Sequence, residues 1–350
     1  MKKYYTRACN FYYGNISRLK IKKKQSLPLN GDKNISFDQV EIISRKSKKI
    51  INFKDINSLK KNLRTKVKED IKKITKKKYF SNLDLLDIPI IMGILNLTPD
   101  SFSDGGKYNN KKRAIIHSKK LIRDGCEIID IGGESTRPNS LTIDEKKEWK
   151  RINPAIVSLV KLKKIISLDT RKSKIMEKGI KFGIKLINDV SGFGYDDNTI
   201  KIIKKYKTPF VIHHMQGTPQ NMQINPKYNN VLLDVYDYFE KKISFLKKNG
   251  IKHNNILIDP GIGFGKNLKH NITLISKISI FHSLGFPILI GISRKKFIKD
   301  ISGLNDSKER LGGTISAALF SMLQGVQILR VHDVNEIKQS IKVFKSIINA

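Results

Sequence analysis

Cysteine, long apolar runs and acidic residues are what this 350-residue chain has little of. Its two cysteines, Cys9 and Cys126, lie far apart, so they form no disulfide framework and lack the spacing of a zinc site. No run reaches the roughly 18 apolar residues of a membrane-spanning helix. The start, MKKYYTRACNFYYG, has no continuous apolar stretch of the signal-peptide kind. We therefore expect a soluble cytoplasmic protein with both thiols reduced.

The shortage of acidic residues leaves a net charge of +37, from 68 Lys and Arg against 31 Asp and Glu. Clustered basic residues gain affinity for nucleic acid by releasing phosphate counterions, so such binding has to be considered. The excess is spread, however, with +18 in residues 1–80 and +19 in the remainder. Most of it is lysine on the faces of expected helices, which favours a solvated surface. Neither a nucleic acid nor a membrane is therefore an expected partner.

Residues 1–85 differ in pattern from the rest of the chain and are expected to form a basic N-terminal extension. Short strand-like runs and a turn signal precede a Lys-rich amphipathic stretch at residues 57–78. The runs are Asn10–Tyr13, Ile35–Ile43 and Ile50–Phe53. No catalytic constellation is visible there, so we interpret the segment as a small subdomain ending in a helical linker, with a second domain at residues 86–350.

From residue 90 onward, apolar strand patterns alternate with amphipathic helix patterns, which predicts βα units and a parallel sheet. The expected strands are Ile90–Leu97, Glu127–Ile131, Ile165–Leu168, Leu186–Val190, Pro209–His213, Asn255–Ile258, Pro287–Ile292 and Gln327–Val331. The first helix is expected at Lys111–Asp124 and the last at Val334–Ile348. Eight units in about 260 residues match a (β/α)8 TIM barrel. A doubly wound sheet is the alternative, but no GxGxxG follows the first strand.

Polar residues cluster where the expected strands end, which in a TIM barrel is the face that carries the active site. A single Asp at a strand end more often caps a turn or helix, but all eight strands end in polar groups. They are Asn96 and Thr98; Asp130 with the loop GGESTRP; Asp169 and Thr170; Asn188 and Asp189; His213, His214 and Met215; Asp259 with PGIGFGK; Ser293, Arg294 and Lys295; and Arg330, His332 and Asp333.

The types of polar group at the strand ends indicate which class of ligand binds there. Carboxylate, amide and amine groups suit the alternating donors and acceptors of a planar heterocycle. These groups belong to Asp169, Asn188, Asp259 and Lys295.

A second set suits an anion. Arg137, Arg330 and His332 offer positive charge and donors for phosphate or pyrophosphate. Asn96 supplies a neutral oxygen for Mg²⁺, an ion that rides on substrate phosphates.

Other interpretations of these residues find less support. His213 and His214 lack a second ligand at helical spacing, so zinc is unsupported. The glycines of PGIGFGK fit a phosphate cradle and a tight turn equally well, and the P-loop pattern is missing. No Ser-His-Asp order or activated cysteine favours covalent catalysis.

Eight motifs, in order, resemble those of the dihydropteroate synthase family, the folate-pathway enzymes that sulfonamides target. They are IMGILNLTPDSFSDGG, IDIGGESTRP, SLDTRK, INDVSG, HHMQGTP, IDPGIGFGK, GISRK and RVHDV. The resemblance covers residues 86–350 and leaves the N-terminal extension outside it. It implies a TIM-barrel transferase that condenses 6-hydroxymethyl-7,8-dihydropterin pyrophosphate with p-aminobenzoate to 7,8-dihydropteroate and pyrophosphate.

The resemblance also implies roles for particular residues. The pterin pocket falls on Asp130, Asp169, Asn188, Met215, Asp259 and Lys295. The pyrophosphate site falls on Asn96, Arg330 and His332, with Mg²⁺ held by Asn96 and pyrophosphate oxygens. The p-aminobenzoate site falls on Thr136, Arg137, Pro138, Phe264 and Ser293. The catalytic groups are Asp104, Arg137 and Lys295, the first two brought in by closing loops.

Two alternatives share the barrel. A pterin-binding methyltransferase would need neither the STRP loop nor the RVH anion site, and a catalytically silent pterin-binding barrel would not need Asn96, Arg137 and Lys295. All of these features are present. The family resemblance also implies a homodimer.

Overall fold

A ring of eight parallel strands forms the centre of the protein, in a computed structural model that describes residues 3–81, 83, 85, 89–98, 109–137, 140–162 and 164–349. The strands are β5 (Ile90–Asn96), β6 (Ile128–Gly132), β7 (Ile165–Asp169), β8 (Leu186–Asp189), β9 (Phe210–His213), β10 (Ile256–Asp259), β11 (Leu289–Gly291) and β12 (Ile328–Val331). Each coincides, within a few residues, with a strand expected from the sequence. The prediction of eight strands is confirmed.

The order of the strands identifies the fold. They pair as β10-β9-β8-β7-β6-β5-β12-β11, all in parallel. A parallel bridge between Ile258 and Ile288 joins the two ends of that series, and the Ile258 amide donates to the Pro287 carbonyl at 3.1 Å. The sheet therefore closes on itself as a TIM barrel, and the open doubly wound alternative is wrong.

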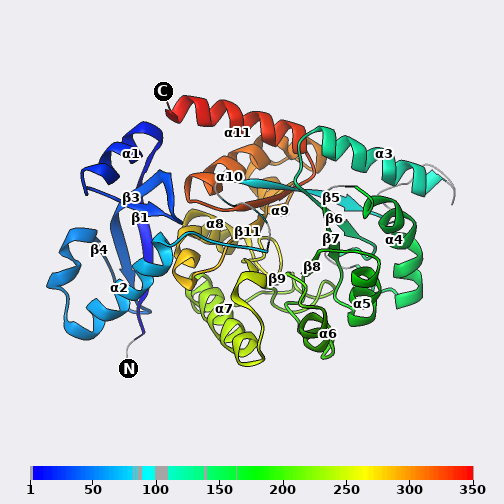
Figure 1. Cartoon of the computed structure of the whole chain (residues 1–350), viewed down its shortest axis with the longest axis horizontal. Coiled ribbons are helices and arrows are strands. Elements are labelled where there is room, and N and C mark those ends of the chain that lie inside the picture. Colours follow the sequence, from blue (N-terminus) through cyan, green and yellow to red (C-terminus); the bar gives the residue numbers. More distant parts are fainter. Residues whose placement is uncertain are drawn as a thin grey trace.

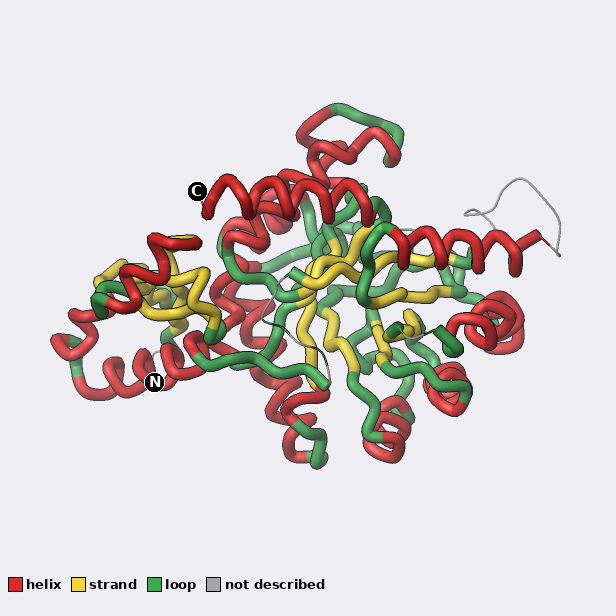
Figure 2. The backbone as a smooth tube through the Cα atoms, turned by 45° about the horizontal axis from the view of Figure 1, so that its top comes forward, coloured by secondary structure: helices red, strands yellow, loops and turns green. Residues whose placement is uncertain are grey.

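Helices surround the ring on its outer side, as Figures 1 and 2 show. They are α3 (Asn109–Arg123), α4 (Glu145–Leu159), α5 (Ser173–Lys181), α6 (Thr199–Tyr206), α7 (Val231–Lys248), α8 (Leu268–Ser276), α9 (Lys296–Ser302), α10 (Leu311–Leu323) and α11 (Val334–Asn349), with 3-10 turns η3 (His253–Asn255), η4 (Ile278–Leu284) and η5 (Lys308–Arg310). The expected first and last helices are confirmed. In the described parts of the chain, no helix is both long and apolar enough to cross a membrane.

The N-terminal extension forms a small antiparallel sheet of its own beside the barrel (Figure 1). Its elements are β1 (Tyr5–Tyr13), α1 (Gly14–Lys22), β2 (Leu27–Leu29), β3 (Asp32–Ile43), β4 (Lys48–Asn52), the 3-10 turn η1 (Phe53–Ser58) and α2 (Lys61–Thr75). The long strand β3 pairs with all three others. The expected strands and the amphipathic helix are present, and β2 is an addition.

This sheet packs against one end of the barrel, and the two share a hydrophobic cluster. Buried residues of the sheet, including Ala8, Phe37 and Val40, join apolar residues from the beginnings of the barrel strands. Those strand residues are Ile90, Met92, Ile128, Ile165, Leu186, Val211, Leu257, Leu289 and Ile328. We call this end of the ring the barrel base. The expected boundary at residue 85 stays a prediction, but the extension closes the base.

Polar contacts add to this attachment. The Tyr5 hydroxyl donates to Asp237 of α7 at 2.9 Å, and its ring packs edge-on against Tyr236 at 5.1 Å between centroids. The Ser279 hydroxyl donates to the Ala8 carbonyl at 3.0 Å. The extension is therefore held to the barrel by burial and by specific hydrogen bonds.

Candidate active site

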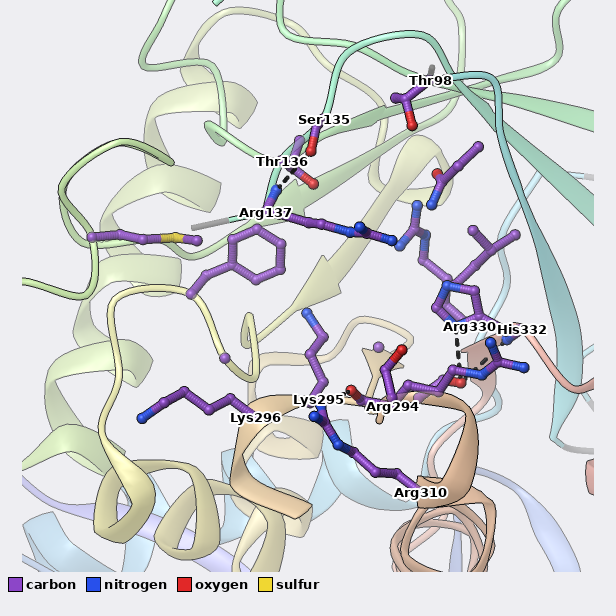
Figure 3. A pocket seen from close by; sticks show the side chains of 18 of the residues that line it. Thr98, Ser135, Thr136, Arg137, Arg294, Lys295, Lys296, Arg310, Arg330 and His332 are labelled. Atoms are coloured by element: carbon purple, nitrogen blue, oxygen red, sulfur yellow. Dashed lines mark hydrogen bonds between the residues drawn. The ribbon is translucent and has the colours of Figure 1, made fainter. Parts of the chain in front are cut away.

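The opposite end of the barrel, where the strands finish, holds a cavity of about 500 Å³. We call this end the barrel mouth. Figure 3 shows Thr136 and Arg137 on one side of the cavity and Lys295 and Arg310 on the other. Of the residues predicted from the sequence, the lining includes Asn96, Thr136, Arg137, Phe264, Ser293, Lys295, Arg330 and His332. The closed ring thus brings together side chains from both halves of the chain.

Beneath this cavity, two carboxylates share one guanidinium. Arg330 donates from Nε to Asp130 Oδ2 at 2.7 Å and from its terminal nitrogen to Asp169 Oδ2 at 2.8 Å. Asn188 Nδ2 donates to the same oxygen of Asp130 at 3.0 Å. Arg330, expected at an anion site, therefore also neutralises the carboxylates expected to bind the heterocycle.

Two buried oxygens in this group have no hydrogen-bond partner among the described residues: Asp130 Oδ1 and Asn188 Oδ1. Leaving a buried acceptor unpaired costs free energy, so native structures seldom do it without a reason. Both oxygens are acceptors, and a ligand carrying N–H groups would satisfy them.

Three ionisable groups near these oxygens, Asp169, Asp259 and Lys295, have pKa values far from their ordinary ones. Burial, with the neighbouring Asp130, raises the pKa of Asp169 to about 8 despite the Arg330 guanidinium. Burial also raises the pKa of Asp259 to about 6. Burial and Arg330 lower the pKa of Lys295 to about 8. Strongly shifted acid and base groups together at the end of a barrel are typical of a functional site.

An apolar wall faces these polar groups. The Lys295 ammonium lies over the Phe264 ring, 4.1 Å from its centroid. Phe264 packs with Val190 and Met222, and the half-buried Met215 contacts the same cluster. The cavity therefore combines an aromatic surface with a cation, which suits a flat ring system.

On the anion side, the His332 ring is neutral. Burial and the nearby arginines lower the pKa of His332 to about 3. Its Nδ1 lies 3.0 Å from the Ser293 hydroxyl, and a hydroxyl that donates to Nδ1 leaves the ring proton on Nε2. His332 can thus bind an anion as a hydrogen-bond donor, while the positive charge there comes from the arginines.

His213 and His214 are structural neighbours of the site. His213 Nδ1 lies 3.0 Å from the Val190 carbonyl oxygen, and His214 Nδ1 lies 2.9 Å from the buried Lys266 ammonium. Burial lowers the pKa of both histidines well below the ordinary value. Lys266 also donates to the Phe264 carbonyl at 2.8 Å. These contacts fix the turn that presents Phe264.

The glycines of PGIGFGK allow the loop after β10 to pack directly on the loop after β9. Gly261 has φ +68°, and a Cβ there would lie 2.0 Å from the His214 carbonyl oxygen. Gly265 has φ +59°, and a Cβ there would meet the Gln216 carbonyl oxygen at 2.5 Å. Of the two interpretations left open by the sequence, close packing of a tight turn accounts for these glycines.

The residues that line the cavity differ in part from those predicted. Two predicted residues, Asp104 and Pro138, are outside the part of the chain that the structure describes. Met222, Gln223 and Arg310 line the cavity but end no strand. Gln223 donates to the Gly263 carbonyl at 2.7 Å from a segment distant in sequence. Only the closed fold reveals such residues.

The donors at the mouth also bear on the expected Mg²⁺. Within the described ranges, no group of three or more His, Cys, Asp or Glu side chains could hold a metal ion. Asn96 is half-buried and lines the cavity beside Arg137 and Arg330. This set fits an ion that arrives on an anionic substrate and takes one protein oxygen, as Mg²⁺ often does.

Comparisons with known proteins agree on one family. The model of the pterin binding enzyme family matches residues 92–332. Dihydropteroate synthase from Neisseria meningitidis serogroup B is 42% identical over 268 residues, covering 75% of this chain and 94% of the relative. The Escherichia coli K12 enzyme of the same name is 38% identical over 276 residues, covering 78% and 97%.

Solved structures give the same result. The Yersinia pestis dihydropteroate synthase in complex with a sulfonamide drug matches with a TM-score of 0.72 at 37% identity, covering 77% of this chain and 97% of that one. The Xanthomonas albilineans dihydropteroate synthase in complex with 7,8-dihydropteroate matches with a TM-score of 0.69 at 32% identity, covering 76% and 95%.

Proposed function

This chain belongs to the dihydropteroate synthase family of pterin-binding enzymes, and we propose how its barrel mouth carries out the family's reaction. The enzyme is a transferase that condenses 6-hydroxymethyl-7,8-dihydropterin pyrophosphate with p-aminobenzoate, releasing pyrophosphate. The observation that supports our assignment of the mouth best is the pair of unpaired buried acceptors, Asp130 Oδ1 and Asn188 Oδ1.

The pterin ring binds in the deepest part of the mouth. Its N–H groups donate to Asp130, Asn188 and Asp169, and Asp259 and Lys295 complete the ring of polar partners. Met215 packs on the ring face. Because the ligand's donors replace missing hydrogen bonds, pterins are bound in preference to rings without N–H groups along that edge.

The pyrophosphate binds nearer to solvent, against Arg330, the Nε2–H of His332 and the side chain of Asn96. Asn96 would hold a Mg²⁺ ion that arrives with the substrate, and such an ion would supply positive charge against the charge that develops on the leaving group. Arg330 stabilises the same charge without moving, because its hydrogen bonds to Asp130 and Asp169 already hold it in place at the cavity.

The arylamine binds in the outer part of the cavity, between Phe264 and the segment holding Thr136 and Arg137, with Ser293 at its edge. Pro138 and Asp104 are assigned to this side on the resemblance alone. An arylamine is neutral near pH 7, so the site positions it more than it deprotonates it. Its nitrogen attacks the pterin methylene carbon as the C–O bond to pyrophosphate breaks, and the proton lost from nitrogen passes to water.

The experiment that tests this function measures pyrophosphate release from the pterin substrate and Mg²⁺, with and without p-aminobenzoate. The wild-type protein should need the arylamine, and the Lys295→Ala and Asn96→Ala variants should lose activity. Pterin binding without turnover would move the function to the methyltransferase or the silent pterin-binding barrel.

We further propose that the enzyme is a cytoplasmic homodimer. Free, buried Cys9 and Cys126 suit a reducing compartment. Apolar side chains are exposed on the adjoining helices α10 and α11, with Phe320 at 46% and Ile347 at 65% exposure, which suits a protein interface. Sedimentation of the wild-type protein and of Phe320→Glu tests this: a dimer that persists in the variant would exclude this face.

A further inference from the structure

Four charged side chains lie buried beside the mouth and have no part in the chemistry described above. They are Glu134, Glu148, Arg171 and Lys172, which we call the buried quartet; none is more than 7% exposed. Two acids balance two bases. Buried charges persist only where they are paired and hydrogen-bonded, and apolar residues could often replace them without loss of stability. Stability alone therefore does not explain why the quartet is present, which favours a functional role.

Within the quartet, Glu134, at the start of the loop that follows β6, is hydrogen-bonded to a residue at the far end of that loop. Glu134 Oε2 accepts from Arg171 Nε at 2.9 Å, and Oε1 accepts from Lys172 Nζ at 2.9 Å. Oε1 also accepts the backbone N–H of Ile143 at 3.0 Å. Glu134 lines the cavity with the three residues that follow it, Ser135, Thr136 and Arg137, whereas Ile143 lies at the far end of the same loop, two residues before α4. One carboxylate therefore ties both ends.

The other half fixes this tie to the barrel. Lys172 Nζ donates to Glu148 Oε2 at 2.5 Å, and Glu148 Oε1 accepts from the Thr170 hydroxyl at 2.6 Å. Arg171 donates to the Thr142 hydroxyl at 2.9 Å. Residues 170–172 directly follow strand β7, which ends at the pterin-site carboxylate Asp169. The loop after β6 is thus linked to the end of β7.

We propose that the buried quartet is a set of positioning residues that holds Thr136 and Arg137 at a fixed height above the pterin pocket, where p-aminobenzoate binds. The inference rests on the proposed function, because it takes those two residues as the arylamine site. Small displacements of positioning groups lower reaction rates by up to about 100-fold. Loosening the quartet should therefore lower kcat/KM for p-aminobenzoate by about 10- to 100-fold, through a raised KM, and leave pterin binding unchanged.

The decisive variant combines Lys172→Met with Glu148→Gln. It removes one acid and one base, so the interior stays neutral, and the new amide oxygen can still accept from Thr170. The matched control combines Lys174→Met with Glu145→Gln. That pair lies 3.5 Å apart with side chains 74% and 37% exposed, so the same chemical change is made outside the quartet. Single Lys172→Met is less informative, because it strands a buried carboxylate and threatens folding.

For each protein we would measure KM for both substrates, the pterin Kd by calorimetry, and hydrogen exchange at the Ile143 amide. The quartet variant should show a raised arylamine KM, an unchanged pterin Kd and faster exchange, and the control should match the wild type. An unchanged arylamine KM, or a pterin Kd weakened in parallel, would overturn the inference. If the wild type makes no product, the proposed function fails, while the exchange rate still decides whether the quartet holds the loop.

Discussion

The two ends of the barrel are built from the same strands but differ in chemistry. Along five strands, an apolar residue at the base is followed two positions later by a polar one at the mouth. The pairs are Ile128 and Asp130, Leu186 and Asn188, Val211 and His213, Leu257 and Asp259, and Ile328 and Arg330. Side chains two apart share a face of a strand, so both members of each pair face the same way. One end can then be specialised for stability and the other for chemistry.

The largest effect is expected on stability, from a substitution at the barrel base. Phe37 is fully buried between the N-terminal sheet and the barrel, so Phe37→Ala should cost about 3–5 kcal/mol of unfolding free energy. Chemical denaturation measures the loss, and Ile50→Ala, at a residue 57% exposed, is the control. The folded fraction should keep its kcat; a large drop in kcat would show that base and mouth are coupled.

At the mouth the reverse result is expected. Asp169→Asn removes the carboxyl acceptor that bonds the charged Arg330 guanidinium and is assigned to the pterin. The loss should be about 1.5–3 kcal/mol, or roughly 10- to 100-fold in kcat/KM. Steady-state kinetics with varied pterin substrate measures it. Asp197→Asn makes the same change at an exposed position in a nearby loop and should have no effect. Equal losses of kcat/KM in the two variants would show that Asp169 does not bind the pterin.

Charge burial at the mouth should appear in the pH dependence of stability. The folded protein holds the Asp169 proton up to about pH 8, whereas an unfolded chain loses it near pH 4. The folded state binds more protons in that interval, so this group's contribution to stability falls as pH rises. Between pH 6.5 and 8, the wild type should lose up to about 2 kcal/mol relative to Asp169→Asn. Parallel stability curves would contradict the raised pKa.

The smallest effect is expected at the surface joining the extension to α7. Arg45 pairs with Asp234 at 2.8 Å and Asp237 at 2.7 Å, but its side chain is 44% exposed. Exposed pairs contribute about 0.2–1 kcal/mol, so Arg45→Ala should lower stability by no more than this. Lys46→Ala is the neighbouring control. A loss as large as that of Phe37→Ala would mean that charge, not burial, attaches the extension.

Local patterns predicted the barrel better than the extension. In the barrel, a glycine next to the end of a helix pattern signals where the helix stops. Five such glycines have positive φ: Gly125, Gly183, Gly250, Gly285 and Gly325. In the extension, β1 was expected only from Asn10 but begins at Tyr5, because its first half lacks alternation. The strand β2 was missed, since it has three residues and contains Pro28. Short or irregular strands depend on their neighbours for definition.

By itself, the sequence determined the eight strands, their order along the chain and the polar residues at their ends. These features are local, because strand and helix periods and glycine turns act over a few residues. Only the tertiary structure decided that Arg330 joins Asp130 to Asp169, that the buried quartet ties two loops, and that the extension closes the base. Each of these depends on closure of the ring, which brings together residues that no local pattern pairs.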